Sequence, residues 1–229
     1  MAHDPSSSPA ARAAVLRQAA SIGVATGAYG VSFGALAVTA GLDIWQTMVL
    51  SLLLFSGGSQ FAVVGVLGDG GSGQAAVATS TLLGVRNGLY GLETSQILRP
   101  SGWRRLAAAH LTIDESTAVA VGQPTPGLAR LGFWATGLAV FAGWNALTFV
   151  GAVLGNAVGD PRRFGLDAAA AAAFCALVWP RLRALDARLV AVGAVLIALT
   201  MAPLTPAGVP VLAAVAAAVV VGAGRWGSP

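Results

Sequence analysis

Hydrophobic residues fill most of this chain in long stretches, and polar residues are confined to the short connections between them. The apolar stretches are 19–40, 44–67, 75–98, 128–156, 165–180, 188–203 and 208–224. An α-helix needs about 20 consecutive apolar residues to cross a bilayer. The pattern therefore predicts an all-α polytopic membrane protein with about six to seven transmembrane helices.

The connections are short and rich in glycine and proline, as at 68–73 and 159–163, and none is long enough for a soluble domain. Residues 1–18 are polar and contain serine and proline, so we expect a mobile N-terminal tail. They lack the apolar core and cleavage site of a signal peptide. The remainder, 19–225, is expected to form a single transmembrane domain.

Composition and charge agree with a multi-pass protein of the cell membrane. The chain is 56% hydrophobic and 10% charged, whereas soluble domains carry about 25% charged residues. Most arginines lie in short loops, which is the pattern of cytoplasmic loops in membrane proteins. No basic stripe with interleaved aromatic residues occurs, so a nucleic-acid partner is not expected. The loop arginines are Arg12, Arg17, Arg99, Arg104, Arg105, Arg181, Arg183 and Arg188.

The arginine positions conflict with a simple count of spans. They place the tail, the 99–105 loop and the 181–188 loop on the cytoplasmic side. Three apolar stretches separate the tail from the 99–105 loop, an odd number. Either one of them fails to cross, or the N-terminus is outside, or the polar stretch 103–122 also enters the membrane. The stretch 44–67 is the first candidate for a broken or re-entrant helix.

A short sequence that occurs twice suggests an internal repeat. The letters GLD occur at 41–43 and again at 165–167, each time before an apolar stretch. Asp is a favoured helix N-cap residue, and many transporters contain two related halves. Three letters also recur by chance in a chain of this composition.

The sequence FSGGSQF, residues 55–61, interrupts the apolar stretch 44–67 at its middle. Two adjacent glycines lower helix propensity by about 1 kcal/mol each relative to alanine, and glutamine is costly to leave unpaired in hydrocarbon. One interpretation is a kinked helix packed through glycine. The other is a break that lines a cavity, with free N–H and C=O groups for a charged substrate. The second predicts a substrate site at Ser56, Gly57, Gly58, Ser59, Gln60 and Phe61.

Two further stretches contribute candidate site residues. In the first apolar stretch, Gly23, Gly27, Gly30 and Gly34 have the small-residue spacing of tightly packed helices. These glycines also allow Tyr29 and Ser32 to face a cavity. In the third stretch, Arg86 lies mid-membrane and requires a partner or a cavity; Glu93, two turns further on, is on the same face. The candidates beside Arg86 are Asn87 and Tyr90.

The polar stretch 103–122 contains three titratable residues, His110, Asp114 and Glu115. Thr112 and Glu115 have the spacing of a capping box, which is the structural interpretation. Alternatively, Asp114 or Glu115 carries a proton or binds an ammonium group; with Glu93 they are the candidates for proton or ion coupling. Enzyme and metal-binding motifs do not occur, so we expect no catalytic residues, no metal and no cofactor.

In order, the motifs GAYGVSFGALAVTAGL, FSGGSQFA, LGVRNGLYGL and AHLTIDES closely resemble those of the AzlC-type branched-chain amino acid permeases. The resemblance runs from about Ile22 to Ser116 and resumes more loosely at FGLDAAAAAAFCALVWP. Two positions depart from the usual motifs. Gly58 stands where the family ordinarily has alanine, and GVRN lacks the asparagine and histidine that flank the arginine in many members.

The resemblance implies a subunit that exports branched-chain and similar hydrophobic amino acids. It further implies a small AzlD-like membrane partner and an ion gradient as the source of energy. Phe33, Phe55 and Phe61 would surround the substrate's aliphatic side chain. The alternatives are a carrier or channel for another small solute and a membrane scaffold without transport activity.

Overall fold

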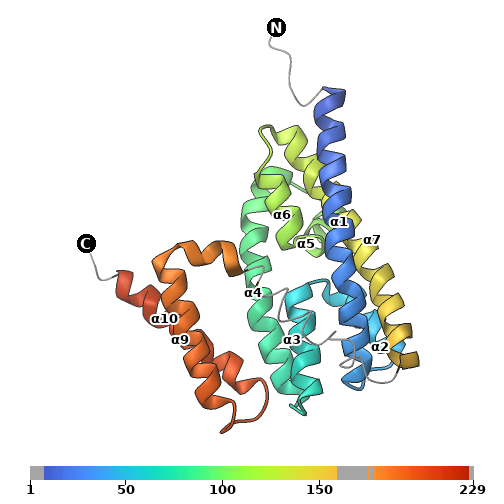
Figure 1. Cartoon of the computed structure of the whole chain (residues 1–229). Coiled ribbons are helices and arrows are strands. Elements are labelled where there is room, and N and C mark those ends of the chain that lie inside the picture. Colours follow the sequence, from blue (N-terminus) through green and yellow to red (C-terminus); the bar gives the residue numbers. More distant parts are fainter. Residues whose placement is uncertain (1–7, 159–174, 176–177, 227–229) are drawn as a thin grey trace.

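The computed structural model describes residues 8–158, 175 and 178–226, and within these ranges the chain is helical and contains no strand (Figure 1). Long helices alternate with pairs of short ones. The elements are α1 (Pro9–Thr39), α2 (Ile44–Leu54), α3 (Gly57–Gly68), α4 (Gly73–Leu98), α5 (Trp103–His110), α6 (Asp114–Val121), α7 (Pro126–Val158), η3 (Trp179–Arg183), α9 (Leu185–Met201) and α10 (Val209–Trp226).

Helix α1 begins earlier than the hydrophobic pattern indicated. It starts at Pro9 and continues without interruption to Thr39. Proline is favoured in the first helical turn, and the alanine, leucine, arginine and glutamine that follow are strong helix formers. The second half of the expected polar tail is therefore helical, and the apolar part of α1 begins about three turns further along.

Helices α1 and α7 pack against each other along most of their length. Gly23 lies against Ala139 and Gly34 lies against Gly151, so residue numbers rise together and the helices run parallel. The seam is closed to side chains, because a methyl group at Gly30 would lie 2.7 Å from the Trp144 carbonyl oxygen. Close approach through small residues replaces the hydrophobic driving force that is absent between helices in lipid. The packing predicted from the glycine spacing is confirmed.

Helices α2 and α3 form a hairpin rather than one continuous span. The Asp43 carboxylate caps α2 by accepting the Gln46 N–H at 2.7 Å, and α2 ends one residue before Phe55. Residues nine apart in a straight helix are about 13.5 Å apart along its axis, yet Gln60 Nε2 donates to the Ser51 carbonyl at 3.2 Å. Gly68, at the end of α3, is back beside Ala40. The break at FSGGSQF is confirmed, and the chain reverses there.

Helices α5 and α6 form a second hairpin, which joins at residues 111–113. Its first helix, α5, starts shortly after the end of α4, and its second helix, α6, ends beside that same point. The ends of α4 and α6 line one surface hollow. The hairpin therefore enters and leaves on the same side of the molecule. The Arg130 guanidinium Nε, just after this hairpin, donates to the Ile97 carbonyl at 3.1 Å. The stretch 103–122 thus forms the second of two hairpins that enter the helix bundle from opposite ends (Figure 1).

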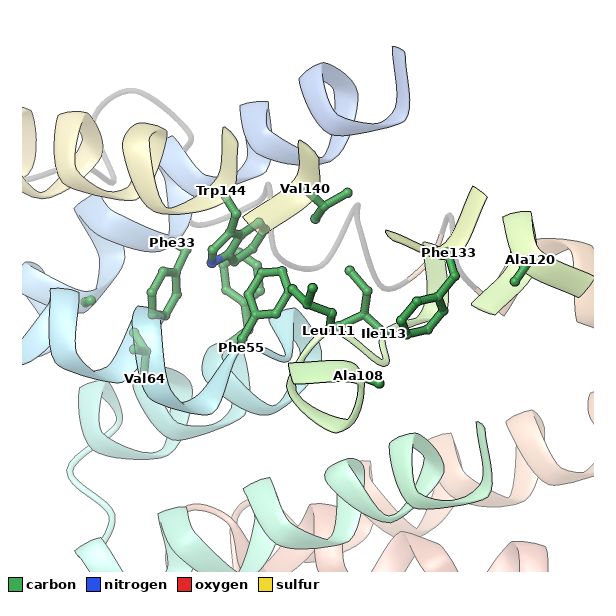
Figure 2. Close-up of a cluster of buried hydrophobic side chains, with 12 residues drawn as sticks. Phe33, Phe55, Val64, Ala108, Leu111, Ile113, Ala120, Phe133, Val140 and Trp144 are labelled. Atoms are coloured by element: carbon green, nitrogen blue, oxygen red, sulfur yellow. The ribbon is translucent and has the colours of Figure 1, made fainter. Parts of the chain in front are cut away.

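The tips of the two hairpins meet in the middle of the molecule. The rings of Phe55 in the first tip and His110 in the second have centroids 5.7 Å apart. Figure 2 shows Phe55 beside Leu111 of the second tip, below Trp144 of α7. Trp144 stacks on Phe33 of α1 at 5.8 Å. One apolar core therefore joins both tips to the α1–α7 pair.

The C-terminal helices α9 and α10 pack against each other and reach the body of the molecule beside α4 (Figure 1). Gly208, which precedes α10, approaches Ala75 at the start of α4. The second GLD sequence, at 165–167, lies outside the described residues, so the internal repeat stays a prediction. Among the described helices, α1 and α7 are each long and apolar enough to cross a membrane.

Candidate functional site

A cavity of about 270 Å³ lies where the two hairpin tips meet. Five elements contribute to it: the middle of α1, the first tip, the middle of α4, the second tip and the middle of α7. Its volume is below the range of about 300–1,000 Å³ that is typical of pockets for drug-sized ligands. Its lining consists of Thr26, Tyr29, Phe55, Ser56, Gly57, Gly58, Phe61, Arg86, Asn87, Ile113, Asp114, Glu115, Val140 and Trp144.

The first tip presents the N-terminus of α3 to this cavity. Ser56 has an extended backbone, and helical geometry resumes at Gly57. The Ser56 side chain does not cap the helix, so the first-turn N–H groups carry the positive end of the helix dipole without a side-chain acceptor. The first tip therefore provides an uncharged site that favours a negative group.

The second tip presents the N-terminus of α6, which begins at Asp114. The Ser116 Oγ accepts the Ile113 N–H at 3.1 Å and donates to the Leu111 carbonyl at 2.6 Å. Thr112 instead donates to the Ala108 carbonyl of α5 at 2.7 Å, so the expected capping box of Thr112 and Glu115 does not form. The Ser116 hydroxyl has taken the capping role, and Asp114 and Glu115 are directed elsewhere.

Arg86 is paired with Asp114 rather than with Glu93. Its Nη1 lies 2.9 Å from Asp114 Oδ2, and the two side chains are 28% and 19% exposed. Glu93 is exposed on α4 and lines the separate hollow near Arg99. Although Glu93 shares a helix face with Arg86, seven residues span about 10 Å along the axis. The partner of the arginine comes from the second tip, which the sequence spacing did not reveal.

Several buried polar atoms of the lining have no hydrogen-bond partner among the described residues. They are Arg86 Nε, Asn87 Oδ1, Asp114 Oδ1 and Trp144 Nε1. A buried polar atom without a partner costs about 1–3 kcal/mol. Other such atoms lie elsewhere in the described residues, at Thr136 and Thr148 for example. The four around the cavity belong to residues that a polar ligand in it would contact.

The second carboxylate, Glu115, faces α1 across the cavity. Thr26 Oγ1 donates to its Oε1 at 3.3 Å. In the described lining, one guanidinium thus faces two carboxylates, so the fully ionised cavity carries an excess of one negative charge. This arrangement can accept a proton or a cationic group.

Aromatic and branched side chains form the rest of the lining. Phe55, Phe61 and Trp144 pack together, with the Phe61 and Trp144 ring centroids 6.1 Å apart. Val140 and Ile113 extend this apolar surface toward the second tip, as Figure 2 shows. Phe33 is fully buried behind Trp144 and does not line the cavity. The pocket lining therefore combines charged with apolar side chains.

The structure gathers most of the residues that the sequence indicated, but not all of them. Tyr29, Arg86 and Asn87 line the cavity with both tips. Ser32 and Tyr90 are outside the lining. Ser59 is buried and donates to the Ser80 carbonyl of α4 at 3.0 Å.

Gln60 also lies outside the lining, since it fastens α3 to α2.

Sequence inspection found Tyr29 of α1 but missed Thr26 of the same helix, both residues of α7 and Ile113 of the second tip. Thr26 precedes Tyr29 by one helical turn and could have been found from that spacing. Val140 and Trp144 are also one turn apart, but they resemble the other apolar residues of the stretch 128–156. Ile113 is an ordinary hydrophobic residue in sequence, and only the chain reversal brings it to the site.

The fold and the site define an all-helical membrane protein with a small central pocket between opposed hairpins. A family model described as AzlC protein matches residues 21–158, more than half of the chain. The chain therefore belongs to the AzlC family, which has a membrane transport-related role. The match includes α7, beyond the motifs from which the resemblance was inferred.

Among curated proteins, the chain is similar to one described as an uncharacterized membrane protein from Helicobacter pylori (strain ATCC 700392 / 26695). The two are 27% identical over 129 residues, which is 56% of this chain and 57% of the relative. The chain thus spans just over half the length of the curated relative it matches. No solved structure was found to match it.

Proposed function

We propose that this protein is the large subunit of an exporter for branched-chain and similar hydrophobic amino acids. The observation that carries the proposal is the composition of the pocket. Its lining combines Arg86 and Asp114 with Phe55, Phe61 and Trp144, and the uncapped N-terminus of α3 lies in the same lining. A small zwitterion with an aliphatic side chain matches this combination. Membership of a transport family supports this proposal.

The proposed topology is multi-pass in the cell membrane, with the arginine-rich end in the cytoplasm. Arg12 and Arg17 of α1, and Arg99 after α4, lie at the end from which the second hairpin enters. The opposite end contains the loop with Asp43 and the loop with Asp69. This asymmetry follows the positive-inside rule. The conflict in the span count disappears, because the first hairpin returns to the side it entered.

Two further parts of the proposal concern what works with this chain. A small AzlD-like membrane subunit would be the partner, and an ion gradient would supply the energy. Asp114 and Glu115 are the coupling candidates that line the pocket, whereas Glu93 is remote from it. In this proposal the protein moves its ligand unchanged and is not an enzyme.

The test is efflux from vesicles preloaded with valine, isoleucine, leucine or methionine, with and without the small partner. We expect efflux of at least one of these amino acids when both subunits and an ion gradient are present. Glycine and glutamate, loaded in parallel, are the matched controls for side-chain selectivity. If none of the four hydrophobic amino acids leaves the vesicles with the partner present, the proposed function is wrong.

A further inference from the structure

In the ion pair between Arg86 and Asp114, each side chain has a hydrogen-bonding atom that the pair does not use. Its contact joins Nη1 to Oδ2, while Arg86 Nε and Asp114 Oδ1 are buried without a partner in the described part of the chain. A guanidinium has five N–H donors and an ionised carboxylate has two acceptor oxygens. Both residues line the cavity, so a ligand that separates the pair would reach the remaining atoms of both groups.

We propose that this ion pair is a latch which an α-amino acid opens by exchange. The inference rests on the proposed function and adds the binding chemistry. The ligand's carboxylate replaces Asp114 as the partner of Arg86, and its ammonium group replaces Arg86 as the partner of Asp114. One charge pair becomes two, and neither side chain is left as an unpaired charge. No covalent bond changes, and no proton has to be transferred.

The neighbouring groups give the exchange a direction. The uncapped N-terminus of α3 lies in the same lining and adds backbone N–H donors for the carboxylate. Asp114 lies at the second tip, so the ammonium group is directed there. The other carboxylate, Glu115, already accepts a hydrogen bond from Thr26 of α1 and has no ion pair with Arg86 in the described residues. Asp114 is therefore the residue that exchanges.

The latch also connects occupancy to the attachment of the second hairpin. Arg86 belongs to α4 and Asp114 to α6, so the ion pair fastens this hairpin to a long helix. A ligand with a carboxylate and no ammonium group would take Arg86 and leave Asp114 charged and alone. Such a ligand binds poorly because an unpaired buried charge is strongly unfavourable. The exchange therefore requires both charged ends of an amino acid.

The test compares three ligands that share one apolar group: leucine, 4-methylpentanoate and 3-methylbutylamine. The second lacks the ammonium group and the third lacks the carboxylate. Each competes with labelled leucine for the purified full-length protein in lipid nanodiscs, with the small partner present. We expect 4-methylpentanoate to bind at least about tenfold more weakly than leucine. If it binds within about tenfold of leucine, the latch is overturned. The affinity of 3-methylbutylamine measures what the excess negative charge of the cavity contributes by itself. This comparison needs no variant.

A pair of matched variants identifies the exchanging residue. Asp114→Asn frees Arg86, so 4-methylpentanoate should bind more tightly than in the wild type and leucine more weakly. The ratio of their affinities should shift by at least about tenfold. Glu115→Gln removes the same charge from the same pocket but leaves the latch, so the wild-type order should remain. An unchanged ratio of the two affinities in Asp114→Asn, or a shift of about tenfold or more in Glu115→Gln, contradicts the proposal.

The experiment separates failure of the latch from failure of the proposed function. If leucine, isoleucine, valine and methionine all fail to bind, the proposed function is wrong and the latch falls with it. If leucine binds but 4-methylpentanoate binds equally well, transport of hydrophobic amino acids stands. In that case only the exchange of charge partners is rejected.

Discussion

The two hairpins solve the same structural problem with different chemistry. Each brings a short helix N-terminus to the centre of the molecule, where its first N–H groups need acceptors. At the second tip, Asp114 and Glu115 provide negative charge in the first turn of α6. At the first tip, α3 begins with glycine and without a side-chain cap. One tip is electrically compensated and the other is not.

In each hairpin, the residues that line the cavity differ from the residue that holds the hairpin together. The first hairpin is held by Gln60, which bonds to the end of α2, and the second by Ser116, which bonds to the residues of its own turn. Neither fastening residue lines the cavity. A polar residue beside the candidate site can thus have a structural role, while its neighbours line the cavity.

Arg86→Ala should have the largest effect, because it removes the cation that faces the charged tip. Asp114 would be left without its partner, at a cost of about 2–5 kcal/mol. We expect efflux of hydrophobic amino acids to be lost and the melting temperature of the purified protein to fall. Arg12→Ala, on the exposed start of α1, is the control and should export normally. The double variant Arg86→Ala/Asp114→Ala should recover much of the stability but none of the export.

Gln60→Ala should open the first hairpin without touching the pocket. It removes the donor to the Ser51 carbonyl, one of the last acceptors of α2. We expect a loss of about 1–3 kcal/mol, seen as a lower melting temperature, and reduced export as a consequence. Gln74→Ala, on the exposed start of α4, is the matched control. If export disappears while the melting temperature is unchanged, Gln60 contacts substrate and its assignment as a fastening residue is wrong.

Ser116→Ala tests the fastening of the second hairpin in the same way. The Ile113 N–H would lose its acceptor, which costs about 1 kcal/mol for a helix N-cap. The melting temperature should fall less than in Gln60→Ala, and leucine affinity should change little. Ser21→Ala, at an exposed position of α1, provides the comparison. A larger fall than in Gln60→Ala would reverse the order of the two fastenings.

Gly57→Ala should have the smallest effect and acts on the uncharged tip itself. The added methyl group would lie 3.4 Å from the Trp144 ring, which is ordinary van der Waals contact. The fold should therefore tolerate it, with an unchanged melting temperature, but the space for the substrate side chain becomes smaller. Efflux assays should show that leucine and isoleucine are affected more than valine. Equal effects on all three would place the aliphatic side chain elsewhere.

Much of the fold could be predicted from sequence because glycine and charge leave clear signals in an apolar chain. The spacing of Gly23 and Gly27 predicted the tight α1 interface, and FSGGSQF predicted the break between α2 and α3. The reversal at that break could not be deduced. A kink and a hairpin have the same local glycine requirement. The contacts of Gln60 with Ser51 and of Gly68 with Ala40 distinguish them.

The sequence predicted the charged residues of the candidate site, because a charge inside a membrane is energetically unfavourable without a partner. It did not predict the apolar residues of α7. Arg86 and Asp114 attract attention because each charge requires a partner. Their pairing depends on how the second hairpin folds, which is a long-range property. Trp144 gives no such signal, because an aromatic residue in an apolar helix has many acceptable surroundings.

The seam between α1 and α7 has a consequence for heredity. At Gly34 and Gly151 the opposing backbone occupies the place that a first side-chain carbon would need. Any coding change at a glycine adds at least that carbon. Neither position therefore has a conservative replacement, and related sequences that retain this seam should show glycine at both. Gly65 and Gly88, which have open space around them, should vary freely over the same evolutionary distance.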